Sequence, residues 1–325
     1  MKENRLAGKK VIIFGGLGFL GTNVSKKASQ EGAEITIVDI NEPPDVDKRL
    51  EYIDNQVEVI KADVREASVV RTLLEDKDIA YCFAGLSGAV NTNKRPLLSL
   101  AVNCAGYLNI LEAAKEIKSE GTLILPSSWL VYGRIAEKDP VKEDHVTKPL
   151  SIYGIHKLAC EYHSSLYHDL YGLNTVVFRI SNPYGLFQSL GNRHYGIINN
   201  FINAALQGQD LLIFGDGHQL RDYIFIEDLI ELFILAGLDR ENAGEIYNVG
   251  SGVSTRLIDV AESVISICGS GRIKHIDWPE DYKQVEPGDY RADINKVCSV
   301  YGWDPNSELE YGLNRTLKIL EQDYK

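Results

Sequence analysis

The feature that most constrains this chain is a glycine-rich turn between a short apolar run and a helical pattern. Val11 to Phe14 form the apolar run, and the turn that follows reads Gly15, Gly16, Leu17, Gly18, Phe19, Leu20 and Gly21. Glycines permit a tight turn, and a helix N-terminus offers unpaired N–H groups to a pyrophosphate. The pattern predicts a dinucleotide site contacted by Gly15, Gly18, Phe19, Leu20 and Gly21. A turn that serves packing alone is the alternative.

The first half of the chain alternates apolar runs with helical patterns. Six strands are expected, at Val11–Phe14, Ile35–Val38, Val57–Ile60, Ile79–Phe83, Leu123–Leu125 and Thr175–Phe178. Two of the helical patterns cover Leu98–Ile117 and Tyr153–Tyr171. Such alternation predicts an α/β fold with a doubly wound parallel sheet of the Rossmann type.

The second half has a looser pattern. Residues 181–196 are rich in Gly, Asn, Pro and Tyr and are expected to form a loop. Helices are expected at about 197–207, 227–238, 254–268 and 307–320, and short strands near 211–214, 222–225 and 246–248. We therefore predict a Rossmann domain at 1–180 with a return segment at about 222–250. Residues 181–221 and 251–325 form a smaller C-terminal α/β substrate lobe in this interpretation.

Asp39 stands at the end of the second predicted strand. A carboxylate there accepts hydrogen bonds from an adenosine ribose and repels a 2′-phosphate, which favours NAD over NADP. Asp63 ends the third strand and is a candidate contact for the adenine. Either aspartate also fits a plainer role, Asp39 in a strand-end turn and Asp63 as a helix N-cap.

Tyr153 and Lys157 lie four residues apart at the start of a predicted helix, so they share one face. A nearby ammonium stabilises a phenolate, which lets a tyrosine exchange protons near neutral pH. Ser128 follows the fifth strand, and a hydroxyl at the carboxyl end of such a strand faces the ligand crevice. Together these residues predict a catalytic set, although the same spacing also occurs on solvated helix faces.

Composition excludes several other classes of protein. The 325 residues carry a formal net charge of -12, and the basic pairs Lys9–Lys10 and Lys26–Lys27 are too short for a nucleic-acid surface. No apolar run near the start is long enough for a membrane span. Five scattered cysteines and the absence of metal-ligand spacing predict reduced thiols, a cytoplasmic protein and no metal site.

The glycine loop, Asp39, Ser128, Tyr153 and Lys157 together resemble the extended short-chain dehydrogenase/reductase family. The resemblance covers nearly the whole chain and is strongest to the nucleotide-sugar epimerase branch, typified by UDP-glucose 4-epimerase. It is carried further by the segments Val102–Gly106, Arg179–Gly185 and Gly215–Tyr223.

The resemblance implies roles for further residues. It places Val64, Ala84, Gly85 and Asn103 along the NAD cofactor, with Tyr153 and Lys157. It places Ser128, Asn182, Asn200, Phe214, Arg221 and Asp289 around a nucleotide-sugar substrate. It also implies a homodimer built from the helices at 98–117 and 153–171, and a monomer with both helices in its core is the alternative.

Two departures from the family pattern bear on the reaction. An arginine is expected three residues before Asp289, where this chain has Glu286, so the nucleotide and the sugar stay open. The residues after Ser128 are Trp129 and Leu130, and neither is an acid or base. The related dehydratases have Asp-Glu after the hydroxyl and the UDP-glucuronate decarboxylases keep a glutamate nearby, so the resemblance disfavours both reactions here. We therefore expect epimerisation at C4 of a UDP-hexose through a 4-keto intermediate. A keto-sugar nucleotide reductase and a non-catalytic dinucleotide sensor remain as alternatives.

Overall fold

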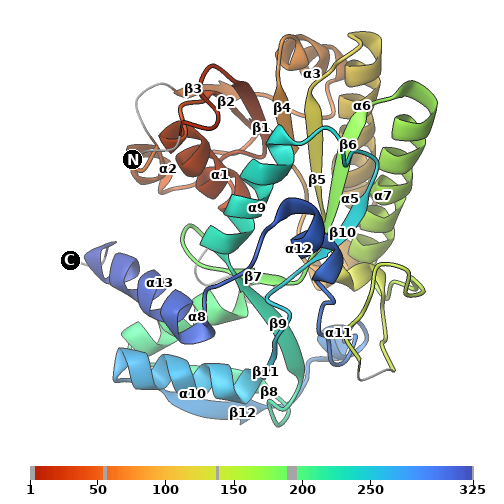
Figure 1. The fold of residues 1–325 in the computed structure, drawn as a ribbon. Coiled ribbons are helices and arrows are strands. Elements are labelled where there is room, and N and C mark those ends of the chain that lie inside the picture. The colour runs from red at the N-terminus through yellow and green to blue at the C-terminus, as the bar shows by residue number, and fades with distance from the viewer. Residues whose placement is uncertain (1–3, 54–56, 137–138, 189–195, 324–325) are drawn as a thin grey trace.

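The computed structural model describes residues 4–53, 57–136, 139–188 and 196–323 (Figure 1). Its main sheet is parallel, with the strand order β10-β6-β5-β4-β1-β2-β3. The strands are β1 Lys10–Phe14, β2 Glu34–Asp39, β3 Val57–Lys61, β4 Ile79–Cys82, β5 Thr122–Ser128, β6 Asn174–Ile180 and β10 Ile246–Val249. The chain runs outward from β1 in one direction and from β4 in the other. The ligand crevice of such a sheet lies at this reversal, beyond the carboxyl ends of the strands.

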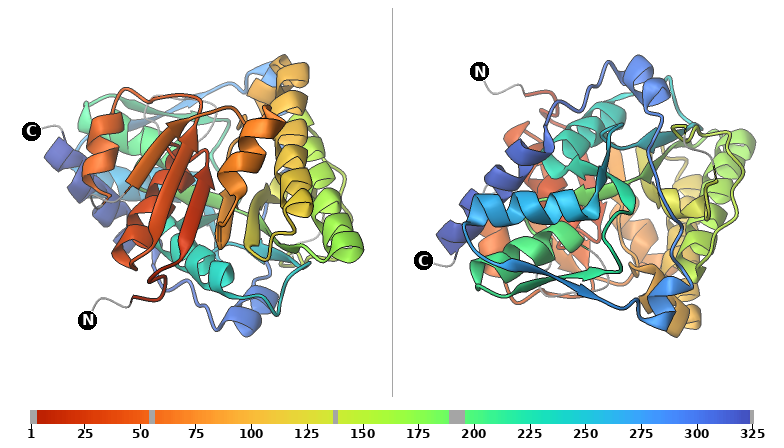
Figure 2. Two further views of the ribbon diagram at one scale, coloured as in Figure 1. Left: turned by 90° about the horizontal axis from the view of Figure 1, so that it is seen from above. Right: turned by 90° about the horizontal axis from the view of Figure 1, so that it is seen from below.

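Helices cover both faces of the main sheet (Figure 2). Successive side chains of a strand point to opposite faces, and β1 shows the result. Val11 and Ile13 pack into a core shared with α1 and α9, whereas Ile12 and Phe14 pack into a core shared with α3, α6 and α7. The bounds are α1 Phe19–Gln30, α2 Val46–Glu51, α3 Ala67–Leu74, α4 Ala89–Lys94, α5 Pro96–Ser99, α6 Gly106–Glu116, α7 Ile152–Tyr171 and α9 Ile226–Leu238. The predicted α/β doubly wound fold is confirmed.

A smaller lobe packs below the carboxyl ends of the main sheet in the view of Figure 1. It contains a three-stranded sheet in the order β11-β9-β7 and a parallel pair, β8 with β12. The strands are β7 Asn182–Tyr184, β8 Asp210–Phe214, β9 Leu220–Phe225, β11 Ser254–Arg256 and β12 Arg272–Ile276. The helices are α8 Ile197–Leu206, α10 Leu257–Cys268, α11 Glu280–Lys283 and α13 Leu309–Asp323.

Several elements differ from the expectations. Residues 182–184 form β7 inside the predicted loop because they pair in parallel with β9, while 189–195 lie outside the described residues. Residues 254–256 form β11 instead of starting a helix, since they pair with β9. Helix α12, Asn295–Tyr301, was not predicted; it packs against β10 and α9 of the larger domain.

The predicted helix at Leu98–Ile117 contains a π-helical segment, η1, Leu100–Ala105, between α5 and α6. Such segments are rare and are frequent at functional sites. Among the described residues, Pro96–Glu116 is also the one helix that meets the length and composition of a membrane span, and half of its apolar window is buried in the protein. A core helix meets the same criterion, and α6 packs here against α3 and α7.

Candidate active site

The glycine loop packs against the end of β4. Gly15 has φ +79, and a Cβ there would lie 2.6 Å from the backbone nitrogen of Ala84. Gly18, Phe19 and Leu20 follow at the start of α1, which no side chain caps among the described residues. A Cβ at Gly21 would collide with the backbone of Gly15 and Gly16. The uncapped helix N-terminus therefore suits an anionic ligand, and the loop fits a dinucleotide diphosphate.

Asp39 lies directly against this loop. Its Oδ2 accepts a hydrogen bond from the N–H of Leu17 at 3.1 Å, and its Oδ1 accepts one from the N–H of Asn41 at 3.1 Å. Burial raises the pKa of the Asp39 carboxyl, and the backbone N–H groups oppose that shift. The carboxylate is thus fixed at the end of β2, where a ribose would meet it.

Asp63 lies two residues after the end of β3, and its carboxylate is bound by the side chain of Arg65. Arg65 donates to both oxygens from its side chain, and this pairing lowers the pKa of Asp63. Val64 is buried next to it, and its carbonyl oxygen accepts a hydrogen bond from Asn109 at 2.9 Å. An adenine contact by Asp63 would have to coexist with Arg65.

The Asn103 side chain holds the backbone that follows β4. Its Oδ1 accepts from the N–H of Leu86 at 2.7 Å, and its Nδ2 donates to the carbonyl oxygen of Leu86 at 3.0 Å. Ala84 and Gly85 precede that contact, and a Cβ on Gly85 would lie 3.1 Å from Asn103 Oδ1. Asn103 therefore shapes this loop through its side chain. A small enclosed cavity of about 10 Å³ brings Val64, Ala84, Asn103 and Lys157 together.

Ser128, Tyr153 and Lys157 come from two elements. Ser128 is the last residue of β5, and its Oγ accepts from the N–H of Leu130 at 3.2 Å. Ser151 caps α7 by accepting from the N–H of Gly154 at 3.2 Å, so Tyr153 and Lys157 lie in the first turns of the helix. The Nζ of Lys157 lies 5.7 Å from the centroid of the Tyr153 ring. The ammonium thus accompanies the ring, as the spacing predicts.

A buried polar network lies behind these residues and was not predicted. Arg179 of β6 pairs with Glu161 of α7 at 2.7 Å, and Glu161 also accepts a hydrogen bond from Ser127. Arg179 donates further to the Tyr132 hydroxyl at 3.0 Å, and that hydroxyl donates to Asn248 Oδ1 at 2.6 Å. Glu161 lies two helical turns after Tyr153 on α7, and this position is the one feature of the sequence that could have pointed to the network. The network fixes the strand ends on which Ser128 sits.

The predicted substrate residues lie mostly on the smaller lobe. Asn182 begins β7 and donates to the carbonyl oxygen of Asp222 at 2.9 Å, and Asn200 is half-buried on α8. Phe214 packs against Trp278 at 5.3 Å and Tyr282 at 5.2 Å between ring centroids.

Asp289 and Arg221 connect the smaller lobe to the 286–289 turn and to Trp129, which follows β5. Asp289 accepts a hydrogen bond from the N–H of Leu220 at 2.8 Å. Arg221 lies over the ring of Trp129, which follows Ser128, at 5.6 Å, and its guanidinium pairs with Glu286.

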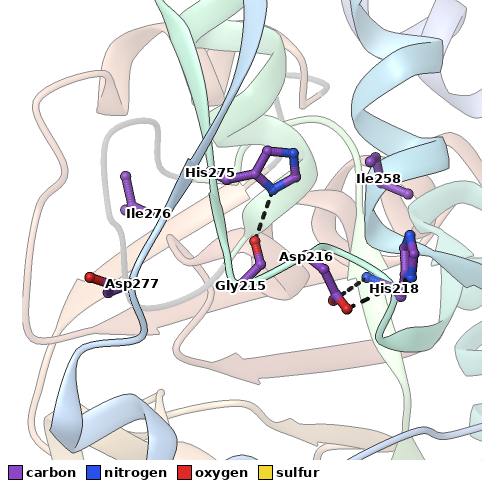
Figure 3. A pocket seen from close by; sticks show the side chains of 7 residues that line it. All are labelled: Gly215, Asp216, His218, Ile258, His275, Ile276 and Asp277. Carbon is purple, nitrogen blue, oxygen red and sulfur yellow. Dashed lines mark hydrogen bonds and ion pairs between the residues drawn. The ribbon is translucent and has the colours of Figure 1, made fainter.

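A shallow depression of about 950 Å³ opens on the same lobe but carries none of the predicted catalytic residues (Figure 3). In it, the Nδ1 of His275 bonds to the carbonyl oxygen of Gly215 at 2.8 Å, and Asp216 accepts from the N–H of His218 at 3.0 Å. These hydrogen bonds join residues of the lobe to one another, and none of the predicted catalytic residues lines the depression. It is therefore a weaker candidate than the carboxyl ends of β1 and β4, where the strand order reverses. Within the described ranges, no cluster of His, Cys, Asp or Glu could hold a metal ion.

Fold and site together define a dinucleotide-binding α/β protein of the extended short-chain dehydrogenase/reductase class. The model of the NAD dependent epimerase/dehydratase family matches residues 11–250, and the chain belongs to that family. The predicted NAD cofactor is thereby confirmed.

Relatives of known name match over nearly their full length. A UDP-N-acetyl-alpha-D-glucosaminuronate decarboxylase of Bacillus cytotoxicus is 29% identical, over 95% of this chain and 97% of its own. A putative UDP-glucose 4-epimerase of Methanocaldococcus jannaschii is 28% identical, over 96% and 99%. The solved UDP-N-acetylglucosamine 4-epimerase of Methanobrevibacter ruminantium, in complex with UDP-N-acetylmuramic acid, has a TM-score of 0.89 at 26% identity, covering 98% and 99%.

Proposed function

We propose that this enzyme epimerises a UDP-hexose at C4 through a 4-keto intermediate. The observation that carries the proposal is the arrangement at the end of β5. Ser128 is the last residue of that strand, Lys157 of α7 donates to the carbonyl oxygen of Pro126 in the same strand, and buried Trp129 follows. The named relatives act on or bind UDP-sugars, which supports a uridine nucleotide.

Each residue of the set has a chemical task in this proposal. Tyr153, as phenolate, takes the proton from the sugar hydroxyl and returns it to the 4-keto oxygen. Ser128 hydrogen-bonds that oxygen in both states, and Lys157 stabilises the phenolate through its positive charge. NAD, when bound, would supply the hydride acceptor and donor for the sugar carbon. The glycine loop and Asp39 hold the cofactor at the switch point of the sheet.

Decarboxylation is the second candidate, favoured by the Bacillus cytotoxicus relative. A 4-keto sugar with a C6 carboxylate is a β-keto acid. Oxidation at C4, with NAD as the hydride acceptor and the same three residues handling the proton, would therefore prepare loss of CO₂. The resemblance leads us to expect a glutamate near the catalytic hydroxyl of a decarboxylase. Here Trp129 stacks on Tyr290 with centroids 4.5 Å apart, and Glu161 is committed to Arg179. This arrangement favours epimerisation.

NMR of the purified protein with UDP-galactose, UDP-N-acetylgalactosamine and their gluco epimers, without added cofactor, tests the proposal. We expect the C4 epimer to appear. Release of CO₂ from UDP-glucuronate, without epimer formation, would establish the decarboxylase. Turnover only with added NADH and a keto-sugar nucleotide would establish the reductase.

We further propose that the enzyme is a cytoplasmic homodimer. Cys82, Cys104 and Cys160 are buried thiols, which suits a reducing compartment. Helices α6 and α7 lie side by side at one edge of the molecule (Figure 2). The outer side of α7 exposes the large side chains of Ile155, Tyr162, Leu166 and Leu170. A continuous apolar stripe of this kind suits burial against a second copy.

A further inference from the structure

Arg221 is the predicted phosphate ligand, and the chain's own acceptors already hold its guanidinium. Nη1 donates to the carbonyl oxygens of Gly288 at 2.7 Å and Leu220 at 3.0 Å, and Nη2 donates to Oε1 of Glu286. The ring of Trp129 lies 5.6 Å from the guanidinium carbon. A phosphate that makes a bidentate contact across Nη1 and Nη2 must therefore displace Glu286.

The turn that carries Glu286 is fixed against β9. Gly288 has φ +88, a left-handed conformation that favours glycine, and its N–H donates to Glu286 Oε1 at 3.1 Å. Asp289 accepts from the N–H of Leu220, which fastens the other end of the turn. The Arg221 side chain is 12% exposed and that of Glu286 is 26% exposed. Water therefore screens the pair only in part, and the carboxylate is a strong competitor for the guanidinium.

The same segment reaches across to the larger domain. Lys94 of α4 pairs with Asp281 of α11 at 2.7 Å. Two acidic side chains of residues 281–286 are thus each bound to a cation of another segment. A diphosphate entering here meets an arginine whose charge is already balanced.

We propose that Glu286 is a specificity-determining residue that competes with the substrate diphosphate for Arg221. The inference rests on the proposed function and narrows it. The substrate is a nucleotide sugar held chiefly through its base and sugar, because its diphosphate gains Arg221 only when Glu286 leaves. A free nucleoside diphosphate lacks the sugar contacts that offset this displacement, so it binds weakly.

Calorimetric titration of NAD-saturated protein tests the proposal, because saturation fills the glycine loop. The probes are inorganic pyrophosphate, UDP and uridine. Glu286→Gln keeps the shape of the side chain and removes its charge. We expect this variant to bind pyrophosphate and UDP about tenfold more tightly than the wild type, because a close competing charge is removed. Uridine has no phosphate and its affinity should not change.

Two variants serve as controls. Asp259→Asn removes one charge from α10 of the same lobe, where the carboxylate pairs with Arg256, and should leave all three affinities at wild-type values. The double variant Arg221→Gln with Glu286→Gln should not show the higher pyrophosphate and UDP affinity of Glu286→Gln, because the guanidinium that would bind the phosphate is absent.

Wild-type affinity of Glu286→Gln for both pyrophosphate and UDP would overturn the proposal. So would an equal gain in Asp259→Asn, or no pyrophosphate binding by Glu286→Gln, since Arg221 would then be no anion site. If pyrophosphate gains affinity but UDP binds no more tightly than pyrophosphate, the uridine part of the proposed function fails while the role of Glu286 stands.

Discussion

The Nζ of Lys157 lies 2.5 Å from the carbonyl oxygen of Pro126, two residues before Ser128. This hydrogen bond joins the second turn of α7 to the carboxyl-terminal end of β5. Lys157 therefore fixes the position of α7, which carries Tyr153, relative to β5, which carries Ser128. Lys157 has a positioning role here in addition to its charge.

Tyr153→Phe removes the hydroxyl and leaves the ring. We expect turnover to fall by about 10²–10⁴-fold, the usual contribution of a general acid/base. NAD binding should persist, because the glycine loop and Asp39 are untouched. NMR time courses and cofactor titration measure the two quantities. Retention of wild-type turnover would sink the role assigned to Tyr153.

Asp39→Asn keeps the hydrogen-bonding shape and removes the charge that repels a 2′-phosphate. We expect the preference for NADH over NADPH to fall by about tenfold, since one close charge is removed. Fluorescence titration with both cofactors measures the ratio. Asp78→Asn is the matched control, because Asp78 precedes the amino end of β4 and its carboxylate pairs with Lys9 at 3.1 Å. An unchanged ratio in Asp39→Asn would show that the carboxylate does not face the ribose.

Glu161→Gln leaves the Arg179 charge buried without its partner. The two side chains are 1% and 7% exposed, so we expect a loss of about 3–5 kcal/mol in the free energy of unfolding. Glu245→Gln breaks the exposed pair with Lys296 and should cost about 0–1 kcal/mol. Urea denaturation compares the two variants with the wild type. Similar losses for both would contradict the importance given to the buried network.

The Arg5 side chain donates to Glu31 and holds the pKa of that carboxyl at about 2, below the ordinary 4.5. The folded pKa is depressed, so the stabilisation is complete above pH 4.5 and is lost as the pH falls towards 2. The stability difference between the wild type and Glu31→Gln should shrink over that window. Urea denaturation of both proteins at neutral pH and at about pH 3 measures it. A difference that does not depend on pH would contradict the pairing.

Local patterns predicted the main sheet and the closeness of Lys157 to the Tyr153 ring. Buried parallel strands are continuous apolar runs, and Tyr153 and Lys157 share a helix face by spacing alone. The strand at Arg272–Ile276 escaped prediction because charged residues interrupt it and much of it is exposed. The pairs Glu161–Arg179 and Arg221–Glu286 join residues 18 and 65 positions apart. Only the folded topology brings such partners together, because the position of Glu161 two helical turns after Tyr153 does not identify Arg179 as its partner.

The exposed apolar stripe on α7 predicts that the protein forms a homodimer through this helix. Leu166 and Leu170 are 50% and 61% exposed and lie one helical turn apart. Leu166→Lys with Leu170→Lys places two charges where a second copy would pack, and we expect monomers in place of dimers by light scattering. Val253→Lys, at a residue that is 64% exposed on the smaller lobe, is the control and should stay dimeric. Unchanged far-ultraviolet circular dichroism would show that the double variant is folded. A folded double variant that still dimerises would place the interface elsewhere, and a monomeric wild type would leave the stripe to another partner.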